Sequence, residues 1–161
     1  MKALIAASGV LALLAANPAM AQVKSLAGTY ALVTANAIDQ TGQIKPMYGA
    51  SPRGMLLMSS DGRYTLAIVA SGLPKFMAGT RHNSTPQEKE AVIDGSIAHF
   101  GTYSLAETGR TVTLTVQGST FPNWEGTRIT MPVSVAGDQY KFRLGKSELG
   151  GTADLTFRKA K

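Results

Sequence analysis

His99 and Tyr103 are the residues whose types and spacing point most directly to chemistry. Both share their parity with Leu105, so in a strand all three side chains point to the same face. An imidazole and a phenol on an otherwise apolar wall could fix the polar group of a bound molecule, or act as acid and base in an isomerisation. The alternative is a core histidine with satisfied hydrogen bonds at a helix–strand junction. The sequence leaves these three interpretations open.

Three other side chains are candidates for ligand contact. Arg53 follows a proline and precedes a predicted strand, where it could be an anion-binding arm at a cavity mouth or only a rim residue. Tyr64 is predicted to share a strand face with Leu66 and Ile68. Trp124, the single tryptophan, lies on a loop that could cover a cavity or plug it. We assign no catalytic residue, and the predicted ligand-binding residues are Arg53, Tyr64, His99, Tyr103 and Trp124.

The composition excludes several classes of chemistry. The 161 residues include no cysteine and two histidines, which removes disulfides, thiolate nucleophiles and iron–sulfur clusters and leaves little room for a histidine-rich metal site. No nucleophile-elbow, Walker, His-Glu-x-x-His or dinucleotide-binding motif occurs, so we predict no cofactor and no metal. The net charge is +6, but the basic residues are scattered without interleaved aromatics, so no nucleic-acid partner is predicted.

The elements that must position these residues are short strands. Apolar and polar residues alternate along Thr111–Gln117, and the same period of two continues in most of the chain, as expected for strands with one buried face. Turns containing glycine separate the segments, for example Ser60–Arg63 and Gly137-Asp138. The pattern predicts an all-β fold, an antiparallel up-and-down β-barrel or a sandwich, with about eight strands.

One helix is expected within this series. Thr85-Pro86-Gln87-Glu88 has the composition of a capping box with proline in the first turn. The helix is predicted to run from Pro86 to about Ala98, with Ile93 and Ile97 on one stripe. The preceding connection, residues 71–85, is rich in glycine, proline, serine and asparagine and is predicted to be the most mobile loop.

The N-terminus has the pattern of an export signal. Lys2 is followed by an apolar run of about fourteen residues and a small-x-small site at Ala19–Ala21, which is typical of a secretory signal peptide and short for a membrane span. The alternative is a buried helix or an uncleaved anchor. We therefore expect a signal peptide at 1–21 and a single domain at 22–161. The expected location is periplasmic, with secretion as the alternative and no stable insertion into a membrane.

Several stretches resemble the lipocalin-like domain family, a calycin-type group of small bacterial and fungal barrels. They follow the family order along nearly the whole chain after residue 21: 26–33, 48–54, 60–64, 100–104, 121–127 and 155–158. In lipocalins proper, a Gly-x-Trp on the first strand meets an arginine of the last strand. The matching positions here are Gly28, Tyr30 and Arg158, with tyrosine in place of tryptophan. The resemblance implies a small barrel and no single activity. Tyr30 and Arg158 could stack to close one end of this barrel, and the alternative is that they contact a ligand.

Three functions are compatible with such a barrel. The first is an exported binding protein that holds a small hydrophobic molecule and orients its polar group with His99, Tyr103 or Arg53. The second is a cofactor-free isomerase, cyclase or lyase that acts on a lipophilic substrate in the same cavity. The third is a filled barrel whose surface has a structural or inhibitory role. The sequence indicates neither the ligand nor the oligomeric state.

Overall fold

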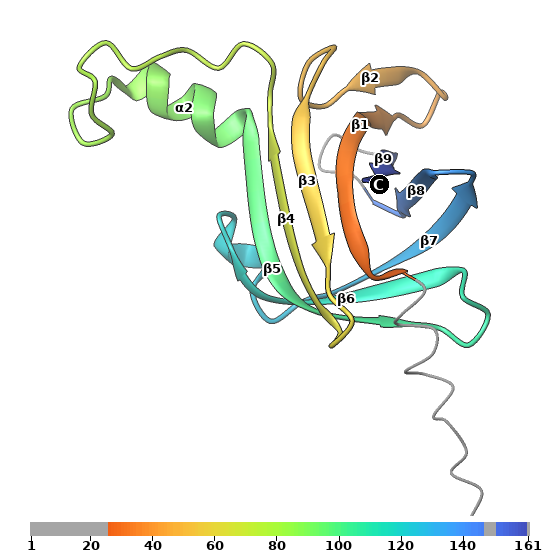
Figure 1. The fold of residues 1–161 in the computed structure, drawn as a ribbon. Coiled ribbons are helices and arrows are strands. Elements are labelled where there is room, and N and C mark those ends of the chain that lie inside the picture. Colours follow the sequence, from red (N-terminus) through yellow and green to blue (C-terminus); the bar gives the residue numbers. More distant parts are fainter. Residues whose placement is uncertain (1–25, 147–150, 161) are drawn as a thin grey trace, which may run out of the picture.

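A computed structural model of the chain describes residues 26–146 and 151–160. Within these ranges the polypeptide forms nine strands, one α-helix and one short 3-10 helix (Figure 1). The expected signal peptide at 1–21 lies outside the described residues. The elements are β1 (Gly28–Ile38), β2 (Ile44–Pro46), β3 (Arg53–Met58), β4 (Arg63–Val69), α2 (Pro86–Asp94), β5 (Ser96–Leu105), β6 (Thr111–Ser119), η1 (Pro122–Trp124), β7 (Arg128–Ala136), β8 (Gln139–Leu144) and β9 (Thr152–Lys159).

Eight of these strands close into a barrel. Each strand from β3 to β9 pairs antiparallel with the next, β3 pairs with β1, and β1 pairs with β9 to complete the ring. The three-residue strand β2 extends the ring only by pairing with the last residues of β1. The predicted up-and-down antiparallel barrel is therefore confirmed, and β2 is the one strand that the alternation does not indicate.

The alternation of buried and exposed residues along each strand determines which side chains point into the barrel. In β4, Tyr64, Leu66 and Ile68 are buried and the residues between them are exposed. β5 repeats the pattern with His99, Gly101, Tyr103 and Leu105 inside, so the shared parity of His99, Tyr103 and Leu105 is confirmed. An eight-stranded barrel is just wide enough for side chains to fill it or to leave room for one small ligand.

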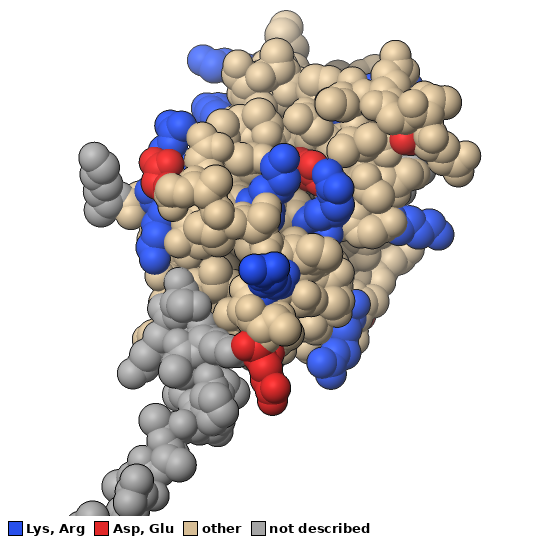
Figure 2. All heavy atoms as spheres, turned by 90° about the vertical axis from the view of Figure 1, so that its right-hand side faces the viewer, with Lys and Arg blue, Asp and Glu red and all other residues tan. Residues whose placement is uncertain are grey.

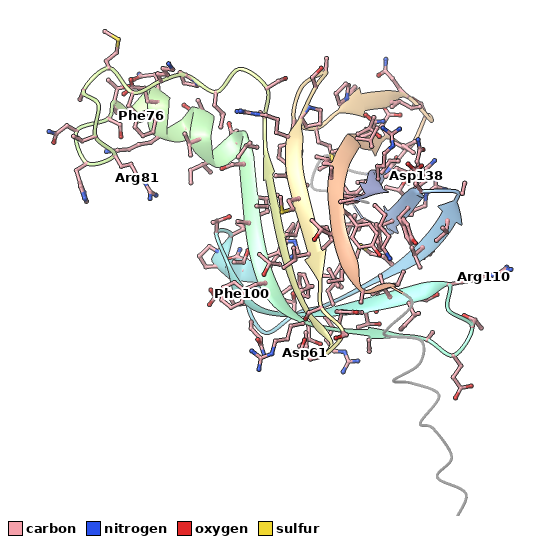
Figure 3. All side chains as sticks on the ribbon, viewed as in Figure 1. Asp61, Phe76, Arg81, Phe100, Arg110 and Asp138 are labelled. Carbon is pink, nitrogen blue, oxygen red and sulfur yellow. The ribbon has the colours of Figure 1, made fainter. Side chains whose placement is uncertain are left out.

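The two ends of the barrel differ, and we call them the closed end and the open end. The closed end holds the start of β1 and the β3–β4 turn with Asp61, whereas α2 and the loop with Phe76 and Arg81 lie at the open end (Figure 3). At the closed end, the Tyr30 hydroxyl donates to the Leu26 carbonyl at 2.6 Å, and the Tyr103 hydroxyl donates to the Ser59 carbonyl at 2.9 Å.

The cation beside Tyr30 is a lysine. The ammonium of Lys159 lies 5.7 Å from the centre of the Tyr30 ring, while Arg158 is exposed and pairs with Asp138 at 3.3 Å. Arg158 points outward because it has the opposite parity to the buried Phe157. The expected stack of Tyr30 on Arg158 is therefore wrong.

Helix α2 is shorter than the sequence suggests. Its capping box is present: the Thr85 hydroxyl accepts from the Glu88 amide, and the Glu88 carboxylate accepts from the Thr85 amide at 2.7 Å. The same carboxylate accepts from the Met77 amide at 2.8 Å, which ties the preceding loop to the helix. The helix ends at Asp94, and Ile97 belongs to β5 because Ile97 pairs with Ile68 of β4. The predicted helix end near Ala98 is thus wrong.

Charged side chains gather on the outer face of β8 and β9 (Figure 2). The guanidinium of Arg143 binds both oxygens of Asp154 at 2.6 and 2.7 Å, with Lys141 at 3.8 Å from the same carboxylate. This neighbourhood holds the pKa of Asp154 below its usual range, chiefly through the hydrogen bonds from Arg143. No helix in the described part of the chain is long and apolar enough to span a membrane.

Candidate functional site

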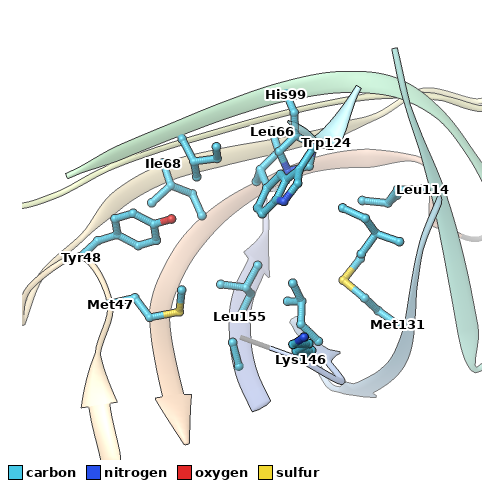
Figure 4. Close-up of a pocket in the computed structure, with 14 residues that line it drawn as sticks. Met47, Tyr48, Leu66, Ile68, His99, Leu114, Trp124, Met131, Lys146 and Leu155 are labelled. Atoms are coloured by element: carbon cyan, nitrogen blue, oxygen red, sulfur yellow. The ribbon is translucent and has the colours of Figure 1, made fainter. Parts of the chain in front are cut away.

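A cavity occupies the open half of the barrel. Its volume is about 80 Å³, and a smaller void of about 20 Å³ lies toward the closed end, among core residues that include Phe142 and Phe157. Apolar side chains supply most of the cavity wall (Figure 4). The lining residues are Met47, Tyr48, Leu66, Ile68, Ile97, His99, Leu114, Trp124, Ile129, Met131, Leu144, Lys146, Ala153 and Leu155.

His99 is the buried polar side chain of this wall. It pairs with Leu66 across β4 and β5, which places it midway along the barrel, and it is only 5% exposed. Its Nδ1 lies 2.9 Å from the hydroxyl of Tyr64, and this hydrogen bond is buried. The two rings meet edge to face, with their centres 5.5 Å apart. Tyr64 therefore holds the imidazole in a fixed orientation from behind, since Tyr64 itself does not line the cavity.

Burial determines the charge of this pair. It lowers the pKa of His99 to about 4, because an imidazolium loses its hydration in an apolar wall. It raises the pKa of Tyr64 to about 12 for the same reason, since the phenolate is the charged form. Both side chains are therefore neutral at pH 7, and the cavity presents a neutral imidazole.

Trp124 forms part of the roof. It ends the short helix η1, which begins at Pro122, and the carbonyl of Trp124 accepts hydrogen bonds from the amide and hydroxyl of Thr127. Its half-buried indole meets His99 edge to face with centres 5.5 Å apart, and Phe121 also meets the indole edge to face. The tryptophan loop thus covers the histidine.

A groove adjoins the cavity at the open end. Its volume is about 620 Å³, and its wall includes Asp94, Ser96 and Thr120. Four residues line both the groove and the cavity: Met47, Tyr48, Ile97 and Trp124. These four side chains therefore separate the interior of the barrel from its entrance.

Comparison with known proteins agrees with this architecture. The sequence model of a family described as lipocalin-like domain matches residues 27–159. The chain belongs to the lipocalin-like domain family. None of the curated proteins compared with the chain matches it. A lipocalin-like barrel suggests small-molecule binding in general, and the cavity is the place where this barrel offers it.

The lipocalin-like barrel brings three of the five predicted site residues together. His99 and Trp124 line the cavity, and Tyr64 supports His99. Tyr103 is inside the barrel, as its parity indicated, but it lies at the closed end and does not line the cavity. Arg53 is exposed and has the outward parity of Met55 and Leu57, so it lies outside the cavity wall.

Sequence reasoning missed several lining residues. In the sequence, Tyr48 only falls within a stretch that resembles the family, and the helical spacing of Ile93 and Ile97 predicts that Ile97 belongs to the helix. Ile129, Met131 and Leu144 could have been identified, because each is an apolar position in the alternation of period two that predicts strands with one buried face. Lys146 follows β8 and carried no such signal.

The site offers hydrogen bonding and apolar contact. Among the described residues that line the cavity there is no carboxylate, and the same part of the chain contains no group of three or more side chains that could hold a metal ion. A ligand inside would therefore meet a mostly apolar wall with a neutral imidazole at mid-depth.

Proposed function

We propose that this protein is an exported binding protein that holds a small hydrophobic molecule in the open half of its barrel. The observation that carries the proposal is the cavity itself, in which a neutral, buried His99 interrupts an apolar wall. A ligand that buries about 200 Å² of apolar surface would gain about 5 kcal/mol before the costs of association.

The dimensions suggest how the ligand lies. A cavity of about 150 Å³ accommodates benzene, so the 80 Å³ inside this barrel holds only part of a larger molecule. The adjoining groove of about 620 Å³ offers room for the remainder. We infer an elongated ligand with one part beside His99 and the rest between α2 and η1, or a ligand that displaces Trp124.

The shifted pKa values favour binding over acid–base catalysis. A general acid or base works best with a pKa near the operating pH, and burial moves the pKa of His99 to about 4 and that of Tyr64 to about 12. A filled barrel is also less favoured, because the cavity lies inside the ring of strands.

Native mass spectrometry of the protein purified from the periplasm tests the proposal. We expect a chain that begins at Gln22 and a discrete adduct of a few hundred daltons that is released on denaturation. Intrinsic fluorescence gives a second measurement, because Trp124 is the single tryptophan and lines the cavity. Hydrophobic ligands should quench or shift its emission.

Ala153→Leu and Ala67→Leu form a matched pair for this test. Ala153 is buried and lines the cavity, whereas Ala67 is exposed on the outer face of β4. The larger side chain at 153 should fill the cavity and abolish binding, and the same change at 67 should leave binding intact. Equal binding by both variants, or an adduct-free protein whose fluorescence responds to no hydrophobic ligand, would overturn the proposal.

A further inference from the structure

The hydrogen bond between Tyr64 and His99 decides which imidazole nitrogen carries the proton. Two arrangements fit the 2.9 Å contact between the Tyr64 hydroxyl and Nδ1: the hydroxyl donates to Nδ1, or Nδ1–H donates to the hydroxyl oxygen. In the second arrangement the tyrosine O–H would need another acceptor. The described part of the chain supplies no second hydrogen-bond partner to Tyr64.

The first arrangement is therefore the stable one. It leaves one donor unpaired, Nε2–H, on a side chain that lines the cavity. The second leaves two groups unpaired, the Nε2 lone pair and the buried O–H of Tyr64, which does not line the cavity. Tyr64 donates, Nδ1 accepts, and the single hydrogen of the neutral imidazole sits on Nε2. The tyrosine thereby makes His99 a hydrogen-bond donor on its other side.

Nε2 is available to a ligand. Among the described residues it has no hydrogen-bond partner, although His99 is 5% exposed. Every side-chain polar atom that is fully sealed within the described structure does have a partner, so Nε2 keeps some accessible surface. The side chain that carries it has the inward parity of β5 and lines the cavity. The wall thus holds one buried N–H that a ligand can satisfy.

We propose that the buried part of the ligand carries a neutral oxygen acceptor, a carbonyl or an ether, which accepts a hydrogen bond from Nε2 of His99. This inference rests on the proposed binding function and adds the chemical class of the ligand. A carboxylate does not suit this position, because a neutral imidazole leaves its charge uncompensated in an apolar wall. The cationic residue of the lining, Lys146, is exposed.

Long-range ¹H–¹⁵N NMR of histidine-labelled protein tests the tautomer without any ligand. The chain has two histidines, and the second, His82, is exposed and serves as an internal reference. We expect His99 to show the hydrogen on Nε2, and Tyr64→Phe to convert it to a mixture. Tyr103→Phe removes a phenol from the closed end and should leave the tautomer unchanged. A hydrogen on Nδ1 in the unaltered protein would overturn the inference.

An isosteric ligand pair tests the acceptor. In 2-nonanone and 2-methyl-1-nonene a C=O replaces a C=CH2, so the ratio of their dissociation constants reports the polar contact. We expect His99→Phe to lower the preference for the ketone about tenfold, since it leaves the buried carbonyl unpaired. The double variant Tyr64→Phe/His99→Phe, which leaves no phenol unpaired, should do the same, and Tyr103→Phe should not.

The outcomes separate the two proposals. If both ligands bind and the ratio does not respond to His99→Phe or to the double variant, the acceptor inference fails while the binding function stands. If neither ligand changes the emission of Trp124 or appears in native mass spectra, the binding function itself fails. A carboxylate such as nonanoate that binds more tightly than the ketone, with a dependence on His99, would also overturn the choice of a neutral acceptor.

Discussion

Buried tyrosine hydroxyls have different partners at the closed end of the barrel and beside the cavity in its open half. At the closed end, Tyr30 and Tyr103 donate to the backbone carbonyls of Leu26 and Ser59. Tyr64 lies at the start of β4, next to the β3–β4 turn, but its hydroxyl contacts a side chain instead, the imidazole of His99 midway along the barrel. A hydroxyl that donates to a backbone carbonyl leaves no further donor at that site. A hydroxyl that donates to Nδ1 of an imidazole keeps the imidazole hydrogen on Nε2, which can donate to a second group.

This difference separates stability from binding within one fold. The closed end is packed and its hydroxyls have backbone partners, so its residues contribute mainly to the folded state. The open end has a cavity and a polar atom without a protein partner, arrangements that reduce stability and provide a place for a ligand. Substitutions at the two ends should therefore change different measurements.

The largest expected effect is that of Tyr30→Ala. Tyr30 is completely buried, and loss of a large aromatic side chain from a packed core costs about 3–5 kcal/mol of unfolding free energy. Denaturant unfolding measures this loss. Trp124→Ala, at the half-buried roof of the cavity, should cost less stability and impair binding more, as native mass spectrometry would show. Weaker ligand binding by Tyr30→Ala protein that is still folded would contradict the separation of stability and binding between the two ends.

The next effect is the dependence of stability on pH. Burial holds the pKa of His99 at about 4, below the ordinary 6.5 of the unfolded chain, so between these values the unfolded chain binds a proton that the folded protein does not. The free energy of unfolding should therefore fall by about 2 kcal/mol as the pH is lowered from 7 to 5.

His99→Phe is the control for this pH dependence. The carboxylates with lowered pKa values, such as Asp154 and Glu88, lose their stabilising effect only at lower pH. The window from pH 5 to 7 therefore isolates the histidine, and the variant should show a nearly flat profile there. An equally steep profile in His99→Phe would assign the effect to another group.

The smallest expected change in stability gives the most direct test of the difference between the two ends. Tyr64→Phe and Tyr103→Phe each remove one buried phenol, and each should cost about 1 kcal/mol of unfolding free energy. Only Tyr64→Phe should change the response of Trp124 to a ketone ligand, because only Tyr64 contacts His99. Similar binding changes in both variants would show that the two ends are coupled.

Much of the fold could be predicted from the sequence, because a period of two is a strong signal in long strands. The helix end is harder to predict for a physical reason: Ile93 and Ile97 are four positions apart, which suits a helical stripe. In the structure the helix ends at Asp94, and Ile97 pairs with Ile68 across β5 and β4. The strand β2 was missed because three exposed residues give no alternation.

The site was harder to predict than the fold. Parity places His99 and Tyr103 on the same face, but four residues of strand span about 13 Å, so one faces the cavity and the other the closed end. Parity also argued against Arg53, which matches the exposed Met55. The contact between Tyr64 and His99 depends on the register of β4 against β5, which the sequence alone does not specify.

The pairing of β1 with β9 determines at which stage of folding the cavity forms. These two strands lie near opposite ends of the described chain, and Thr34 meets Thr156 across them. Pairing over such a long separation is slow to form, and no cavity wall is complete until the last strand has been synthesised and has docked. A ligand that binds only the finished ring would bind last, and a higher concentration of it would raise the fraction of molecules that stay closed.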